Sequence, residues 1–565
     1  MKFQLIAVAL AVSTRVKQAQ GDGHVDGEPF VAINEESYPL DGVGTIDDPQ
    51  DETAGIGAPL LYTRGGKAFG DGLGSPAGDG RPSARRVMQE LYLNSPLVRT
   101  SGSKARAMSH AFSYFGIFLA QELYNPAAGD PVEFFPIPCD DGVMDMQCLP
   151  DQCTGTGEPS TGGVPYSRTN AVVGPDGVRG PVNAATAWTD LGSVYGHDRA
   201  TTDSLLAPLD PSNPTGPRSA KMLLTENGLP EFVDGRWLIA DQRRAELLGT
   251  LALHTLLLRE HNRFVDVLRD SRLAAWEVSE ELDPPGCSPP CSEWTEWDLF
   301  VAARMWTTSV FQHIIEDEYM PLLLGKENSP VEAPEAPWSG ASAQIEAFAA
   351  VAMSFSYSTV TPTDRIINKD YQPLGNDDPL PIHLGMQAAI QRRVLTTWGL
   401  GAVMRGMVFQ GSLEVDAGHT EELTSFMHAA PTANVQLGRD LGLPSYNAVR
   451  EAYNLPAVAS FEDLTGETLV AAKLDDLYPG GIDDLDAIVG AMLEVHDEDS
   501  YPLPPLLRKA LSDQLTRNMV ADERWQDSHN LLTDAEGTTL ADVIRLNPDP
   551  GTESDAEYAT LTNAA

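Results

Sequence analysis

The stretch LHTLLLREHNR, which runs from Leu253 to Arg263, is the strongest local signature in this sequence. It lies inside the largely apolar segment 247–268, which predicts one long helix. The mixed-charge segment DQRRAE, residues 241–246, leads into that helix. Taken alone, the stretch is explained by a helix with a charged C-terminal turn. It becomes informative when the segments on either side are placed around it.

Apolar residues recur at helical spacing along most of the chain, whereas strand patterns are sparse and no internal repeat is visible. Residues 125–185 contain frequent Pro and Gly and predict loops. The other predicted helices are Met108–Leu123, Trp294–Leu324, Ile345–Phe355, Gly385–Met407, Leu469–Leu477, Leu485–Val495 and Leu503–Met519. The pattern therefore predicts a mainly α fold.

Composition sets limits on the partners of the chain. A length of 565 residues suggests roughly two to four domains. The 81 acidic and 38 basic side chains give a formal net charge of −43, which repels phosphate backbones and anionic lipids. Nucleic acid is therefore excluded as a partner. No segment approaches the ~18 uninterrupted apolar residues of a membrane helix, so we expect no membrane span.

The two ends of the chain differ from its middle. Lys2 followed by the short apolar run 3–12 is typical of a signal peptide, here residues 1–20, and predicts a secreted protein. Residues 21–80 are rich in Gly, Asp and Pro and predict an irregular extension, and residues 546–565 predict a flexible tail.

Five cysteines occur in two clusters, at positions 139, 148 and 153 and at positions 287 and 291. In an exported chain such clusters favour disulfides, with one bridge in each cluster and one thiol left over. A zinc site is the alternative, but it would need four ligands at paired spacing, and no histidine lies beside either cluster.

A set of short segments, in order along the chain, resembles the animal haem peroxidase family over residues 81–545. These segments are TAWTD (186–190), SVYG (193–196), DQRRAE (241–246), LHTLLLREHNR (253–263), AR (303–304), QHI (312–314), YMPLLLG (319–325), NVQ (434–436), GRD (438–440), LPSYNA (443–448) and IDDLD (482–486). The resemblance implies a large single helical domain built around a haem pocket, in place of several domains. It also implies haem as cofactor and hydrogen peroxide as oxidant.

Three residues match functional positions of the family. Arg243 matches the distal arginine, a cation that stabilises the leaving oxygen of peroxide. Glu246 matches a glutamate that forms an ester with haem in some members, and Asn434 matches the asparagine that hydrogen-bonds the proximal histidine. The alternative for each is an ordinary residue at a helix end or turn.

The two histidine positions of the family are substituted. Its distal segment FGQFLDHD reads FGIFLAQE here, so that Gln121 stands at the distal histidine position, Ile117 replaces glutamine and Ala120 replaces aspartate. Tyr357 stands at the iron-ligand position, and Ser354 replaces an arginine. Tyrosine can ligate haem iron, as in catalase, but it can equally be a buried aromatic residue with a satisfied hydroxyl.

The resemblance also implies a calcium site. Its oxygen ligands would be Glu122, Thr186, the carbonyl of Trp188 and Asp190. Gly192 stands where the family has a serine, so one ligand is missing or supplied by water. Alternatively, Asp190 is a solvated loop residue.

These residues leave two hypotheses for function. One is a haem-binding oxidoreductase that uses peroxide with altered or weakened activity, with Arg243 and Gln121 at the catalytic positions and Tyr357, Glu246 and Asn434 at the cofactor. The other is a catalytically inactive homologue that acts as an extracellular binding or structural protein. The chemistry of the site has to distinguish the two hypotheses, because one fold can serve many functions.

Overall fold

A computed structural model describes the greater part of the chain. The described residues are 39–43, 55–58, 60, 81–93, 108–126, 132–138, 163–173, 179–278, 295–324, 354–376, 378–420, 423, 430–496, 502–522 and 538–550. All five cysteines, the predicted signal peptide and most of the helix predicted over 345–355 lie outside these residues.

Helices dominate the described part of the chain, which confirms the mainly α prediction. In chain order the α-helices are α2 (Ala84–Val87), α3 (His110–Leu123), α4 (Gly192–Tyr195), α5 (Arg199–Leu205), α6 (Leu248–Val278), α7 (Glu296–His313), α8 (Met320–Leu324), α9 (Phe355–Ser358), α10 (Ile382–Gly385), α11 (Ala388–Trp398), α12 (Leu400–Phe409), α14 (Ala430–Asp440), α15 (Tyr446–Ala452), α16 (Phe461–Thr465), α17 (Thr468–Leu477), α18 (Ala487–Leu493), α19 (Pro505–Ala521) and α20 (Leu540–Leu546). The 3₁₀ and π turns are η2 (Met88–Leu93), η3 (Gln242–Ala245), η5 (Ile314–Tyr319) and η8 (Ile482–Asp484).

The strands are short and form antiparallel pairs at the margins of the helical core. The pairs are β1 (Phe134–Pro138) with β2 (Gly163–Ser167), β3 (Ala171–Val173) with β4 (Arg179–Pro181), β5 (Leu206–Pro208) with β6 (Arg218–Met222), β7 (Phe232–Val233) with β8 (Arg236–Trp237), and β9 (Thr363–Asp364) with β10 (Leu380–Pro381).

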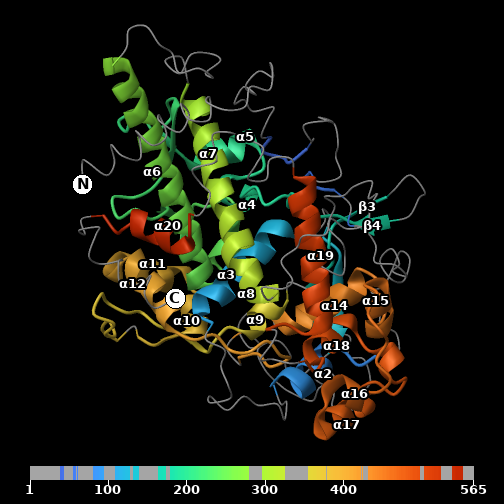
Figure 1. Cartoon of the computed structure of the whole chain (residues 1–565). Helices are drawn as coiled ribbons and strands as arrows, with labels where there is room; N and C mark the ends of the chain where they lie inside the picture. The colour runs from blue at the N-terminus through green and yellow to red at the C-terminus, as the bar shows by residue number, and fades with distance from the viewer. Residues whose placement is uncertain are drawn as a thin grey trace, which may run out of the picture.

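Two long helices, α6 and α7, lie side by side and pass over α3 (Figure 1). Every residue of α3 except Ala120 is buried, as expected of a helix that is apolar on all faces and enclosed by others. Helix α7 begins at a capping box in which Thr295 and Asp298 satisfy each other's backbone N–H groups. The helix predicted over 247–268 is confirmed, since α6 begins at Leu248 and extends to Val278.

Two glycines allow neighbouring segments to approach α3 closely. Gly249 of α6 lies against the ring of Tyr114, where a Cβ atom would overlap the ring. Gly116 of α3 leaves room for the side chains of Ser356 and Tyr319 in the same way. Helices α6 and α9 therefore both contact α3 directly.

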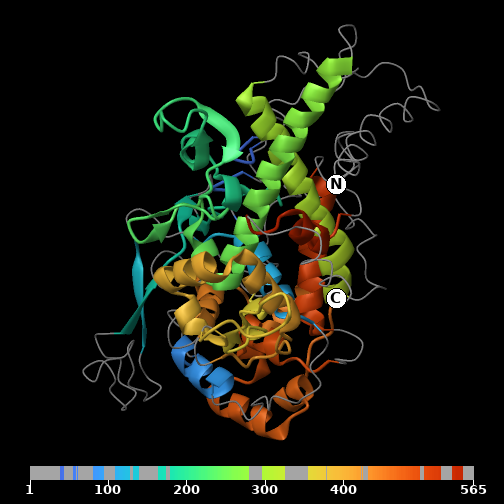
Figure 2. The ribbon, with the colours of Figure 1, turned by 90° about the vertical axis from the view of Figure 1, so that its left-hand side faces the viewer.

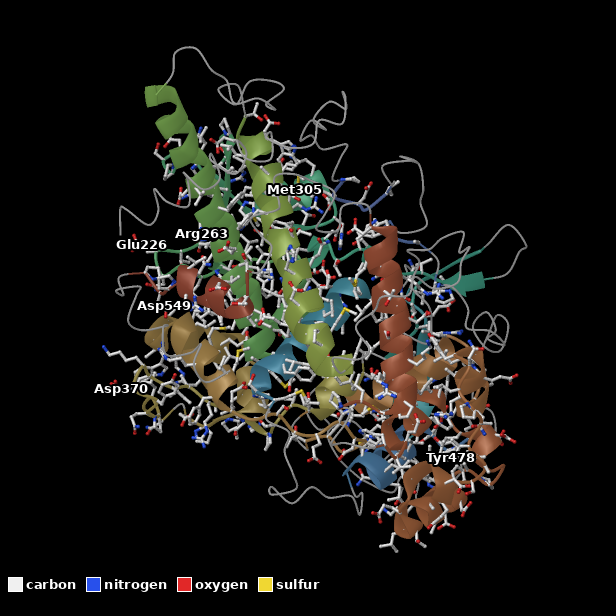
Figure 3. The ribbon with its side chains drawn as sticks, in the orientation of Figure 1. Glu226, Arg263, Met305, Asp370, Tyr478 and Asp549 are labelled. Carbon is white, nitrogen blue, oxygen red and sulfur yellow. The ribbon has the colours of Figure 1, made fainter. Side chains whose placement is uncertain are left out.

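A second group of helices, α14 to α19, packs beside this core and lies on the other side of the molecule from α10 to α12 (Figure 1). When the molecule is turned, α10 to α12 face the viewer (Figure 2). Asp486 connects its parts: it accepts hydrogen bonds from Arg439 and Arg81 and from the Tyr478 hydroxyl. Arg439 and Asp486 are both buried. Figure 3 shows Tyr478 among these helices, far from Arg263 of α6.

Residues of the predicted N-terminal extension and of the predicted C-terminal tail are hydrogen-bonded to the domain. Asp549, labelled in Figure 3, accepts hydrogen bonds from Arg259 of α6 and from the backbone N–H groups of Leu400 and Gly401. The part of the predicted tail that is described, 546–550, is held in this way. In the predicted N-terminal extension, the carbonyl of Gly42 accepts a hydrogen bond from Trp188 Nε1.

In the described part of the chain, no helix combines the length and the apolar character that crossing a bilayer would require.

Candidate functional site

The last turn of α3 holds Gln121 in a closed network. Its Nε2 donates to the carbonyl of Arg243 at 3.1 Å and to Glu246 Oε2 at 3.3 Å. Its Oε1 accepts from Arg244 Nη1 at 3.5 Å. Because a primary amide has two N–H donors, both are used within the protein. Gln121 is buried.

The guanidinium of Arg243 is likewise committed to protein acceptors. Its Nε and Nη2 donate to the carboxylate of Asp241 at 2.9 and 2.5 Å. Its Nη2 also donates to the carbonyl of Gln121 and its Nη1 to that of Tyr124, both at 2.7 Å. This fixes the 241–246 segment against the end of α3. It also leaves few N–H groups of Arg243 for a ligand.

Tyr357, in α9, also lies beside Gln121. Burial is the main cause that raises the pKa of the Tyr357 hydroxyl well above its usual value, and the charge of Glu246 raises it further. The Arg243 cation and the neighbouring polar side chain of Gln121 act in the opposite direction. Burial also raises the pKa of Glu246, to about 7. The structure thus brings Gln121, Arg243, Glu246 and Tyr357 together.

Asn434 is placed in α14 and is half-buried. No hydrogen bond or ion pair in the described part of the chain joins it to these four residues. Its expected role rests on the sequence alone.

The residues of the expected calcium site also lie in one region. The oxygens of Asp190 already have partners, whereas Glu122 Oε1 is buried without a hydrogen-bond partner in the described part of the chain. Asp190 Oδ1 accepts from the Thr186 hydroxyl at 3.0 Å and from the backbone N–H of Gly192 at 2.9 Å. Asp190 Oδ2 accepts from Arg304 Nη2 at 3.3 Å. Trp188 is buried and donates its indole N–H to Gly42.

Glu122 pairs with an arginine that the sequence interpretation gave no role. Its Oε2 accepts from Arg244 Nη2 at 2.8 Å and from the Ser193 hydroxyl, and both charged side chains are fully buried. Burial raises the pKa of Glu122 to about 7, Arg244 opposes this, and the nearby Asp190 adds to it. A second basic residue directly after Arg243 was the one sequence signal that could have pointed to this pair.

A further buried polar cluster, absent from the sequence predictions, lies at the start of α3. The Tyr114 hydroxyl donates to Asp364 Oδ1 at 2.5 Å, and His110 Nδ1 lies 3.5 Å from the same oxygen. All three side chains are buried. Nothing in the sequence connects Tyr114 and Asp364, because they are 250 positions apart.

The fold around α3, α6 and α9 is that of solved peroxidase structures. Peroxidase A from Dictyostelium discoideum superimposes with a TM-score of 0.71 at 20% identity, over 94% of this chain and 99% of that one. A fatty acid alpha-dioxygenase from Oryza sativa superimposes with a TM-score of 0.68 at 16% identity, over 98% and 91%. At these identities the likeness concerns the fold alone.

The sequence places the chain in a family. Residues 44–556 match the description "Animal haem peroxidase", so this chain belongs to the animal haem peroxidase family. It is 25% identical to peroxinectin A of Dictyostelium discoideum over 79% of this chain and 82% of that protein. It is 27% identical to the peroxidasin of Drosophila melanogaster over 64% of this chain, but the match spans only 24% of that longer protein.

Family membership implies haem as cofactor, and the residues present do not fit it. The distal and proximal positions of the family face a haem from its two sides, whereas here the side chains of their occupants, Gln121 and Tyr357, lie next to each other. A macrocycle between them would have to separate this pair. The raised pKa of Tyr357 also disfavours the phenolate that binds ferric iron.

Proposed function

We propose that this protein is a secreted peroxidase homologue in which efficient peroxide-dependent oxidation has been lost. The observation that carries the proposal is that Gln121 and Tyr357, at the two positions that serve haem in the family, lie next to each other, with both N–H groups of Gln121 bonded to other protein groups. The apolar run near the N-terminus supports export. Such a protein would act as an extracellular binding or structural protein, with the enzyme fold as its scaffold.

The chemistry of the two positions supports this proposal. A general acid–base group contributes a rate factor on the order of 10²–10⁴. The amide of Gln121 neither accepts nor returns a proton near neutral pH, and both its N–H groups are already bonded. Glu246 has a pKa of about 7 and lies beside Gln121, but it also lies beside Tyr357, where an added charge disfavours the phenolate.

The second candidate is a haem-binding oxidoreductase with weakened activity. It is favoured by Arg243 and Glu246, which match functional positions of the family and lie directly beside Gln121. In that case Tyr357 would have to leave Gln121 and turn towards the iron.

One experiment separates the two candidates. The full chain is purified from cells supplied with haem, and its absorption spectrum and its peroxide-dependent oxidation of a phenol are measured. We expect no haem absorption band and no turnover above that of free haem. A stoichiometric haem band that disappears in Tyr357→Phe, with measurable turnover, would establish the second candidate and refute the first. Asp203→Asn, a change of an exposed carboxylate in α5, serves as a control for expression and folding.

A further inference from the structure

We propose that the buried guanidinium of Arg244 replaces a calcium ion at the junction between α3 and the 186–193 loop, so that this junction is independent of metal. The family resemblance implies a calcium ion here, with Glu122 and Asp190 as its carboxylate ligands. In this chain each carboxylate is instead neutralised by one arginine.

Arg244 makes the contacts that connect α3 to the loop. Its Nη2 binds Glu122 Oε2 at 2.8 Å and also contacts the Ser193 hydroxyl, at the start of α4. Its Nη1 donates to the carbonyl of Phe118 at 2.5 Å, and the guanidinium carbon lies 3.5 Å from the centre of the Phe118 ring. One fully buried cation therefore holds two turns of α3 against the loop.

Both carboxylate oxygens of Asp190 already accept hydrogen bonds. Three donors use its two oxygens: the hydroxyl of Thr186, the backbone N–H of Gly192 and the guanidinium of Arg304. Calcium requires six to eight oxygen ligands whose lone pairs point at the ion. Here three of the about four lone-pair sites of Asp190 already accept hydrogen bonds.

The space next to Asp190 is filled as well. Gly192 occupies the position of the family's serine, and a Cβ atom on it would overlap the imidazole ring of His197. The missing ligand could therefore not be restored without moving His197.

The charges of the site are balanced without an added ion. Two carboxylates face two guanidinium groups, all four of them almost completely buried. A calcium ion would add two positive charges beside two cations in a region shielded from water, where like charges repel strongly. His197 is the other titratable side chain that faces Asp190, and burial lowers its pKa and keeps it neutral.

The test compares melting temperatures of the full chain in calcium and in a chelator. We expect the unaltered protein to melt at the same temperature in both, and elemental analysis after dialysis to find no bound calcium. A lower melting temperature in the chelator, or about one calcium ion per chain, would overturn the proposal.

Two variants sharpen the comparison. Arg244→Met removes the cation but keeps most of the side-chain volume, so we expect a fall of several degrees in the melting temperature. The matched control, Arg450→Met, breaks a buried pair with Glu494 in another part of the molecule. A calcium response in Arg244→Met that is absent from the control supports the replacement directly. An unchanged melting temperature in Arg244→Met would refute it. If neither variant folds, the unaltered protein alone decides.

Discussion

The buried carboxyl of Asp364 predicts that stability falls as the pH rises from 5 to 8. Asp364 accepts a short hydrogen bond from Tyr114, lies near His110, and is shielded from water by α3 and α10. Burial raises its pKa from 3.8 to about 7. Burial lowers the pKa of His110 to about 3, so that this imidazole stays neutral and does not compensate the carboxylate.

The direction and size of the effect follow from the two pKa values. A carboxyl whose pKa is raised in the folded state binds its proton more tightly there, so its contribution to stability is complete below pH 3.8 and is lost as the pH rises through about 7. A shift of about three units corresponds to about 4 kcal/mol over the whole range. Of this, about 3 kcal/mol is lost between pH 5 and pH 8.

The assay is urea unfolding at pH 5, 6.5 and 8 for the unaltered protein and for Asp364→Asn. The asparagine has nearly the same shape and still accepts the hydrogen bond from Tyr114, but it does not titrate. We expect the unaltered protein to lose about 3 kcal/mol more than the variant between pH 5 and pH 8. The control is Asp203→Asn, which removes an exposed carboxylate and should leave the pH dependence unchanged. Equal pH dependence in Asp364→Asn and in the unaltered protein would refute the reasoning.

Three more outcomes are expected. The double variant Gln121→His with Tyr357→His should recover peroxidase activity only in part, as measured by phenol oxidation, because no arginine accompanies the proximal position; full activity would contradict this. Gly249→Ala should lower the free energy of unfolding by about 1–3 kcal/mol, because its methyl group meets the Tyr114 ring; an unchanged urea midpoint would show that the two helices can separate freely. Asp486→Ala should cost about 3–5 kcal/mol in the same assay, because it leaves buried arginine charge unpaired, whereas a loss below about 1 kcal/mol would mean that water reaches the site.

The helical architecture could be predicted from the sequence because helix periodicity is local. Segments such as 247–268 and 503–519 carry it within a few turns, and the structure has helices there. Boundaries were less accurate. The segment predicted as one helix over 294–324 contains α7, a π turn and α8, and 385–407 contains parts of three helices, interrupted at positions such as Gly399 with its positive φ.

The sequence by itself determined which side chains occupy the positions that matter: Gln121 and Tyr357 in place of two histidines, and Glu122 and Asp190 as a pair of carboxylates. Which residue stands at a position that matches the family can be read from the sequence, without coordinates.

Only the tertiary structure decided what those side chains bind. Arg244 is 122 positions from Glu122, and Arg304 is 114 positions from Asp190. The pairing of such distant groups depends on how the helices pack and on which charges the packing buries together. A buried carboxylate needs a partner. The sequence suggested calcium as the positive partner of Glu122 and Asp190. In the structure, Arg244 of the 241–246 segment and Arg304 of α7 pack against α3 and the 186–193 loop and pair with these carboxylates.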